Sequence, residues 1–288
     1  MIRKEVSDLA KIGEEPRGFS KKYWVEEEIK KLLKYNNDID IDQDVMEKLS
    51  SDILKKVGID CVNVSLGYNS DINTKCCLVD NFLINKSDVL YDIDIPWATR
   101  EIVDTQRDIK FCFGRVFGIF YKLHKIEEKE FKKLNSQYIK MIFGDCIIGN
   151  EDGKLKNVGL IFNKNTHKYR LAPSFDNALS FNNYRYIDNE PVCYIGNQQF
   201  YSKDVIDYII KNHFSDIKDT TEKLDLLVKN DLYNMLANYK GEIEQLKIIH
   251  IINHITDINQ HVNKQKKKLL PETKTKSKKQ LVLTKTNY

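Results

Sequence analysis

The chain has 288 residues, of which 41% are hydrophobic and 31% are charged. This composition excludes a largely disordered protein and provides enough apolar material for a core and a cleft, in one large or two modest domains. The net charge is +4, but nine lysines and one glutamate after residue 263 give the tail +8, so the rest carries −4. The basic isoelectric point therefore says little about the folded part.

Nothing in the sequence points to export or to a membrane. The six cysteines include no Cys-x-x-Cys pair, and the N-terminus lacks the apolar segment of a signal peptide. The most apolar stretch, residues 111–123, contains Arg115 and is too short to span a bilayer. We therefore expect reduced thiols and no membrane partner, in a cytoplasmic protein or a delivered effector.

The first part of the chain predicts a small unit of strands and one helix. Apolar residues at helical spacing indicate a helix over residues 44–57, which Gly58 ends. Alternating apolar and polar residues indicate two strands before this helix and two after it, at 23–25, 31–35, 61–66 and 75–79. The charged turn at residues 26–28 joins the first two strands into a hairpin.

From Trp97 onward the pattern becomes helical. Helices are predicted at 102–123, 131–148, 205–213, 221–236 and 241–262, with one hairpin between them, made of strands at 158–162 and 168–172. The predicted fold is α+β in two lobes: a small β-rich N-lobe at 1–95 and a larger, mainly helical C-lobe at 96–263. The Lys- and Thr-rich tail at 264–288 is predicted to be disordered.

Two polar residues just before the hairpin suggest chemistry. Asp152 and Asn157 are separated by four residues, which is the spacing of the catalytic aspartate and the metal-binding asparagine in kinase-type phosphoryl transfer. Asp176 lies just past the second strand, where such enzymes carry a further metal ligand. The order predicts that Asp152 orients an acceptor hydroxyl and takes its proton, while Asn157 and Asp176 bind Mg²⁺. The simpler alternative is that these residues only cap turns around an ordinary hairpin.

The N-lobe contains candidates for the nucleotide side of such a site. A kinase lobe needs a loop over the phosphates, a strand lysine for them, and a helix glutamate to hold that lysine. The segment Gly18–Lys22 is the candidate loop, Lys34 lies in a predicted strand, and Glu47 lies near the start of the predicted helix. A buried ammonium needs a carboxylate to stay charged, so we expect Lys34 and Glu47 to pair. The alternative is that both are ordinary solvent-exposed residues.

Residues 145–157, together with 171–176, resemble the signature of the HipA-like kinases, which include the shorter CtkA-type proteins. That family combines an apolar-Gly-Asn-x-Asp-x-His-x-x-Asn segment, a strand pair and Leu-Ala-Pro-x-Tyr/Phe-Asp, and the resemblance covers residues 13 to 180. It implies a two-lobed, protein-kinase-like fold that uses ATP and Mg²⁺. Carried over residue by residue, it implies Asp152 as the catalytic base and Asn157 and Asp176 as magnesium ligands. The nucleotide would be bound by Gly18, Phe19, Ser20, Lys22, Lys34 and Glu47.

This chain departs from the family pattern at three points. Lys154 stands where the family has histidine, which puts the packing of the loop or the rate of the reaction in question. The candidate phosphate loop is poor in glycine. The chain begins almost directly at this loop, so the extra N-terminal domain of full-length HipA toxins is expected to be missing.

The resemblance implies a Ser/Thr protein kinase that autophosphorylates, with Ser20 as the candidate residue by its position in the loop. Its partner would be a protein that carries a Ser or Thr acceptor, in a toxin–antitoxin or effector setting. Two alternatives remain open: a kinase of the same superfamily for a small molecule or lipid, and an ATP-binding pseudokinase that regulates a partner.

Two weaker signals favour ordinary structure. His250, His254 and His261 share roughly one face of a predicted helix, but they border its apolar side and are expected to pack rather than to bind metal. The Lys-rich tail lacks interleaved aromatic residues, so we expect a flexible, solubilising segment with at most weak binding to nucleic acid.

Overall fold

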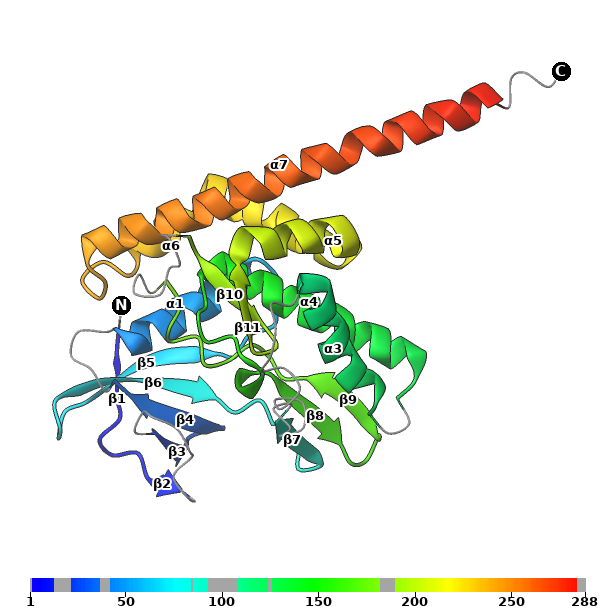
Figure 1. The fold of residues 1–288 in the computed structure, drawn as a ribbon. Helices are drawn as coiled ribbons and strands as arrows, with labels where there is room; N and C mark the ends of the chain where they lie inside the picture. The colour runs from blue at the N-terminus through cyan, green and yellow to red at the C-terminus, as the bar shows by residue number, and fades with distance from the viewer. Residues whose placement is uncertain are drawn as a thin grey trace.

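A computed structural model describes residues 2–12, 22–36, 42–83, 85–92, 108–123, 126–181 and 190–283. The strands are β1 (Lys4–Glu5), β2 (Lys11–Ile12), β3 (Lys22–Glu26), β4 (Lys30–Tyr35), β5 (Val64–Asn69), β6 (Thr74–Asp80), β7 (Asp88–Asp92), β8 (Gly159–Asn163), β9 (Lys168–Leu171), β10 (Val192–Ile195) and β11 (Gln198–Tyr201). The helices are α1 (Gln43–Lys56), α3 (Ile109–Tyr121), α4 (Glu128–Ile148), α5 (Ser202–Leu226), α6 (Leu232–Ala237) and α7 (Gln245–Leu283), with a 3₁₀ turn at Leu155–Asn157 and a π-helical turn at Leu227–Asp231. The predicted α+β fold is confirmed, with a β-rich part at one end and helices at the other (Figure 1).

The N-terminal part is a six-stranded sheet in the order β1-β5-β6-β4-β3-β2, with α1 packed on one face. Strand residues alternate between the two faces, so Leu33 and Tyr35 of β4 join a small cluster on the face away from α1. Lys34, which lies between them in sequence, therefore points to the face that α1 covers. The alternation of this strand decides where the ammonium group of Lys34 lies.

Helix α1 forms because its apolar residues recur at helical spacing. Val45, Leu49 and Ile53 are fully buried, and they belong to a core cluster that continues into the helical part of the molecule. Glu47 lies one turn into the same helix and is 1% exposed. A buried carboxylate of this kind requires a partner.

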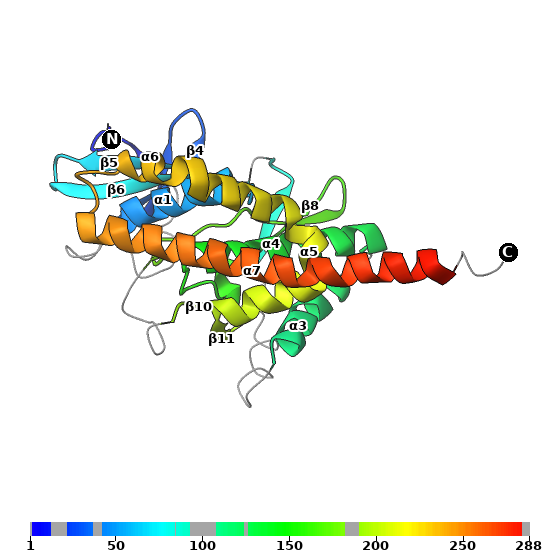
Figure 2. The ribbon, with the colours of Figure 1, turned by 90° about the horizontal axis from the view of Figure 1, so that it is seen from above.

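The helical part is arranged around α4. The last turns of α4 are buried on all sides, with Ile142, Ile147 and Ile148 at 0% exposure, and α3, α5 and α7 pack around it. Seen from above, α7 crosses the whole molecule over α4 and α5 (Figure 2). Gly149 ends α4 in a left-handed conformation, with φ 57° and ψ 46°, a conformation that glycine adopts without strain. This end of α4 delivers the chain into the loop at residues 150–157.

Three sequence-based expectations need correction. The C-lobe has a second hairpin, β10–β11, whose Gly196-Asn197 turn matches the Gly-Asn signal of a two-residue hairpin loop. The tail predicted to be disordered from residue 264 continues α7 as far as Leu283; its Lys and Leu residues favour a helix, whereas Pro271 does not. The strand that the sequence placed at 61–66 lies at Val64–Asn69.

The lobe boundary predicted at residue 95 falls in 93–107, outside the described residues, and stays a prediction. Strand β7, which precedes it, pairs with β8 of the later hairpin to make the three-stranded sheet β7-β8-β9. The first of the predicted C-lobe helices appears as α3, which begins at Ile109. Among the described residues, no helix has the length and apolar character needed to cross a membrane.

Arg3 ties the N-terminal strand to both parts of the molecule. Its guanidinium contacts Asp44 of α1 at 2.5 Å and Glu242, in the turn before α7, at 2.8 Å. The side chains are nearly buried, with Asp44 at 0% exposure. A cation that pairs with buried Asp44 and with Glu242 stabilises the packing of α1 against the helical part. Its removal leaves Asp44 without a cation, whereas Glu242 keeps Lys75 at 3.2 Å.

We predict that Arg3→Ala lowers the free energy of unfolding by about 2–4 kcal/mol, because a buried carboxylate loses its partner. Urea denaturation measures this change. Lys4→Ala is the matched control, since the neighbouring Lys4 side chain is 52% exposed in its pair with Glu27, and its loss should cost less than about 1 kcal/mol. If both variants lowered the free energy of unfolding by the same amount, the stabilising role assigned to Arg3 would be wrong.

Candidate functional site

Three elements meet at Lys34. Its ammonium lies 3.3 Å from an Oε2 atom of Glu47 in α1 and 2.9 Å from Oδ1 of Asp176, which follows β9. The backbone N–H of Asp176 donates to Oε1 of Glu47 at 3.1 Å, which closes the triangle. The predicted pairing of Lys34 and Glu47 is therefore present, and Asp176 joins it.

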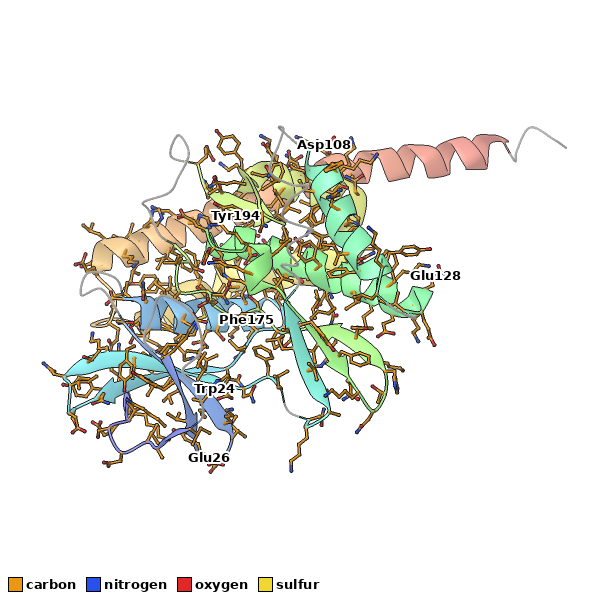
Figure 3. The ribbon with its side chains drawn as sticks, turned by 60° about the horizontal axis from the view of Figure 1, so that its bottom comes forward. Trp24, Glu26, Asp108, Glu128, Phe175 and Tyr194 are labelled. Atoms are coloured by element: carbon orange, nitrogen blue, oxygen red, sulfur yellow. The ribbon has the colours of Figure 1, made fainter. Side chains whose placement is uncertain are left out.

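The segment that carries Asp176 is held in place by backbone hydrogen bonds. Val62 N donates to Ser174 O at 3.1 Å, and Ser174 N donates to Asp60 O at 2.9 Å. Asp176 itself has φ 61°, a left-handed conformation that is uncommon for residues other than glycine and is most accessible to Asn and Asp. Phe175, beside it, stacks on Phe82 and lies between the six-stranded sheet and the β7–β9 sheet (Figure 3).

The electrostatics of this triangle favour a charged lysine. Burial opposes the charge on Lys34, but the carboxylates of Glu47 and Asp176 outweigh it and raise the pKa of the ammonium. Lys34 in turn lowers the pKa of Asp176, whereas burial raises the pKa of Glu47 against the attraction of Lys34. Asp176 is also the accessible member, with 40% of its side chain exposed against 1% for Glu47. The group that solvent or a ligand can reach is therefore a carboxylate beside an ammonium.

Lys22 adds a second ammonium on the same face of the sheet. It stands directly opposite Lys34 across the β3–β4 pair, so both side chains point to the same side. Burial lowers the pKa of Lys22, while Asp176 acts to raise it and Lys34 to lower it. The other residues predicted for the phosphate loop, Gly18, Phe19 and Ser20, lie outside the described residues.

The loop after α4 brings together the second pair of predicted residues. The side-chain amide of Asn157 donates to the backbone carbonyl of Asp152 at 2.6 Å and to its Oδ2 at 3.2 Å. Because the amide nitrogen faces Asp152, the amide oxygen of Asn157 points away from it, as a metal ligand would need. The 3₁₀ turn at Leu155–Asn157 makes this doubling back of the chain possible.

Two lysines of the loop contact Asp152, and neither was assigned a role from the sequence. Lys156 Nζ lies 3.0 Å from Oδ2 of Asp152, and Lys154 Nζ lies 3.8 Å from Oδ1. Lys156 also acts on Asp176, whose pKa it lowers in addition to the larger effect of Lys34. Lys156 therefore links the two halves of the site electrostatically. Its place next to Asn157 was the only signal available in the sequence.

A buried network of polar side chains holds the backbone of the loop at residues 150–157 in place. Asn150 donates to Asp145 Oδ1 at 3.0 Å and to Asn177 Oδ1 at 3.2 Å, and its own Oδ1 accepts from Asp152 N at 3.1 Å. A Cβ at Gly153 would come within 2.5 Å of a carboxylate oxygen of Asp145, so only glycine fits there. Asp145 and Asn150 thus position Asp152 without themselves reaching the open side, and Asn177 ties them to the neighbour of Asp176.

His254 and His261 of α7 each contact a protein group. Burial lowers the pKa of His254 to about 4, and its ring lies 3.3 Å from the carbonyl oxygen of Cys146. His261 contacts Asp207 at 2.6 Å. Within the described part of the chain no group of three or more His, Cys, Asp or Glu side chains is arranged to hold a metal ion. The six cysteines are all free and buried.

Among the comparisons with known proteins, only those with solved structures found similar chains. No protein-family model matches the sequence, and no curated protein matches it either. Among solved structures, the chain is similar to the Helicobacter pylori proinflammatory kinase CtkA, with a TM-score of 0.68 and 14% identity over 92% of this chain and 99% of that one. It is also similar to HipA of the Shewanella oneidensis toxin–antitoxin system, solved with HipB and operator DNA, with a TM-score of 0.50 and 12% identity over 81% of this chain. This chain spans 58% of that HipA chain.

These likenesses define the class of the fold: the chain has the two-lobed fold of HipA-like kinases. The resemblance read from its motifs is thereby confirmed at the level of the fold. The fold brings Lys34, Glu47 and Asp176 into one cluster and Asp152 and Asn157 into another, and Lys156 interacts with Asp152 and with Asp176. The roles of these residues remain predictions.

We predict that Asp145→Asn changes how stability depends on pH. Burial raises the pKa of Asp145 to about 7, partly offset by the hydrogen bond from Asn150. The folded wild type therefore holds a proton that the unfolded chain releases, and its stability falls as pH rises from about 4 to about 7. Asparagine has no such proton. The stability of the variant relative to wild type should rise by about 2–3 kcal/mol between pH 5 and pH 8.

Urea denaturation at the two pH values measures this difference. Asp71→Asn, in the exposed turn between β5 and β6, is the control, and its stability relative to wild type should be the same at both pH values. A difference between Asp145→Asn and wild type that stays constant from pH 5 to pH 8 would show that Asp145 is ionised in the folded protein throughout.

Proposed function

We propose that this protein is a Mg-ATP-dependent kinase that phosphorylates Ser or Thr residues of proteins. The observation that carries the proposal is the Lys34–Glu47–Asp176 triangle, with Lys34 Nζ at 3.3 Å and 2.9 Å from the two carboxylates. A strand lysine held by a helix glutamate beside an accessible aspartate is the arrangement that kinase-type phosphoryl transfer uses. The likeness to the fold of CtkA supports the same class of reaction.

On the nucleotide side, Lys34 and Lys22 would neutralise phosphate oxygens. Lys34 is fixed by two carboxylates, so its ammonium needs little reorganisation when a phosphate arrives. Glu47 stays buried and orients the lysine, while Asp176 faces the open side. Lys22 is on the same face of the sheet and adds charge where the phosphates would lie.

On the acceptor side, Asp152 would orient the hydroxyl and take its proton. The acceptor oxygen then bonds to the γ-phosphorus as the bond to the β,γ-bridging oxygen breaks, and ADP leaves with the electron pair. Asn157 holds Asp152 through its amide, and Asn150 holds the backbone of the same residue. These contacts restrict Asp152 to the geometry that proton transfer needs.

The donor set fits magnesium. Asn157 offers an amide oxygen and Asp176 a carboxylate that is 40% exposed, and Mg²⁺ takes few protein oxygens of this kind together with phosphates and water. Bound Mg²⁺ would supply charge neutralisation for the β- and γ-phosphates. Asn157 and Asp176 are therefore the residues proposed to hold it.

We predict that Asp152→Ala and Asp176→Ala each lower the rate of phosphate transfer from ATP by at least about 100-fold. Asp152→Ala removes the proton acceptor, and Asp176→Ala removes a carboxylate from the metal site. Transfer of labelled γ-phosphate to the protein itself and to a mixture of acceptor proteins measures both effects. Asp204→Ala, an exposed aspartate in the first turn of α5, is the control and should keep the wild-type rate.

The other outcomes separate the rival functions. Transfer that survives both substitutions would contradict the proposed site. Phosphorylation of metabolites or lipids without any protein product would indicate a small-molecule kinase. Stabilisation of the wild type by ATP without turnover would indicate a pseudokinase.

We further predict that Ser20 becomes phosphorylated when the wild type is incubated with Mg-ATP. The reason is its position in the sequence, two residues before Lys22 in the candidate phosphate loop. Phosphopeptide mapping measures this, with Asp152→Ala as the control that should stay unmodified. A wild type that transfers phosphate to other proteins while Ser20 stays unmodified would contradict this prediction alone.

A further inference from the structure

The loop around Asp152 carries two lysines whose ammonium groups lie close to its carboxylate. Lys154 and Lys156 both contact the carboxylate of Asp152, at 3.8 Å and 3.0 Å. Their side chains are 35% and 49% exposed, against 16% for Asp152. The two ammonium groups therefore lie on the solvent side of the carboxylate that would hold the acceptor hydroxyl.

These lysines differ from the lysines on the nucleotide side. Lys34 is nearly buried and has two carboxylate partners. Lys154 and Lys156 share one, since Asp152 is the single carboxylate in ion-pair contact with either among the described residues. When Asp152 binds an acceptor hydroxyl, Lys154 and Lys156 have this one carboxylate between them in ion-pair contact, and Lys156 also interacts electrostatically with Asp176.

The second hairpin fixes this charged edge in place. The backbone N–H of Leu155, between the two lysines, donates to Oδ1 of Asn197 in the β10–β11 turn at 3.3 Å. Lys154 Nζ lies 5.1 Å from the centre of the Tyr194 ring on β10, and Tyr194 is labelled in Figure 3. A cation at this distance over an aromatic face is held there by the ring quadrupole. The ammonium of Lys154 is thus preorganised on the acceptor side.

We infer that the acceptor of this kinase is an acidic protein segment, with Asp or Glu side chains within a few residues of the phosphorylated Ser or Thr. Carboxylates beside the acceptor hydroxyl would pair with Lys154 and Lys156, whereas lysines or arginines there would be repelled. The inference rests on the proposed function and names the substrate class for the same site. It assigns Lys154 and Lys156 as specificity-determining residues.

The test compares two synthetic peptides that carry the same central Ser, flanked on both sides by Glu in one and by Lys in the other. For the wild type we expect kcat/KM to be about tenfold higher for the Glu peptide, and this preference to shrink as salt is raised. The double variant Lys154→Glu, Lys156→Glu should reverse the preference. The ratio between peptides is the readout, because both variant positions contact Asp152 and the overall rate will also change.

Lys168→Glu is the matched control. Lys168 is exposed at the far end of the β8–β9 hairpin, where it pairs with Asn163, roughly four residues or about 13 Å along β8 from the loop. Its substitution changes the net charge in the same direction and should leave the peptide ratio unchanged. An equal shift in Lys168→Glu would mean that net charge alone sets the preference, which would overturn the assignment.

The remaining outcomes also decide the question. A wild type that transfers phosphate and treats both peptides equally, prefers the Lys peptide, or accepts neither overturns the inference while the proposed function stands. A double variant that changes KM for ATP but not the peptide ratio places the lysines on the nucleotide side, which also overturns it. A wild type without any phosphate transfer contradicts the proposed function itself.

Discussion

Lys34 places an ammonium group beside Glu47, whose side chain is 1% exposed. Each of these buried charges needs the other as a partner, and much of the fold depends on bringing them together. Either charge alone would destabilise the folded protein, because removing one partner of a buried ion pair leaves the other charge buried without compensation. The alternation of β4 must turn Lys34 to the inner face, and α1 must present Glu47 to it. The segment after β9 must then bring Asp176 from 142 residues away. An error in β4 or α1 leaves a buried charge unpaired, and an error after β9 removes the second carboxylate from Lys34.

The helical part of the molecule keeps α1 in the position that this pair needs. On the outer side of α1, Tyr239 donates to Asp52 at 2.6 Å, and Lys56 contacts Asp231 at 3.2 Å. Arg3 contacts the start of the same helix from β1. The apolar side of α1 belongs to the same core as α4 and α7. Glu47 is therefore carried on a helix that is fixed at both ends and along its length, which makes the pair with Lys34 part of the folded state.

The sequence predicted the elements with clear periodicity, and with them the residues those elements carry. The helix predicted at 44–57 and the strand predicted at 31–35 agree with α1 and β4 within a residue or two. The pairing of Lys34 with Glu47 is predicted by the pattern of a kinase lobe and not by this periodicity. Asp152 and Asn157 could also be recognised from the sequence, because only four residues separate them. The buried network around Asp145 could not be predicted in this way. Asp145 accepts from Asn150, which also donates to Asn177, and a contact between residues 27 apart leaves no local pattern in the sequence. The helical tail of α7 was missed because its composition resembles that of a disordered segment.

The replacement of the family histidine by Lys154 has a physical consequence that can be located. A neutral imidazole would add no fixed charge near Asp152 at neutral pH, whereas lysine adds one that persists. The change falls on the open side of Asp152, where Lys154 and Lys156 both reach its carboxylate. The triangle of Lys34, Glu47 and Asp176 keeps its own balance of one ammonium and two carboxylates. In the proposed kinase, this lysine would alter the charge that an acceptor meets and would leave the Lys34–Glu47–Asp176 triangle unchanged.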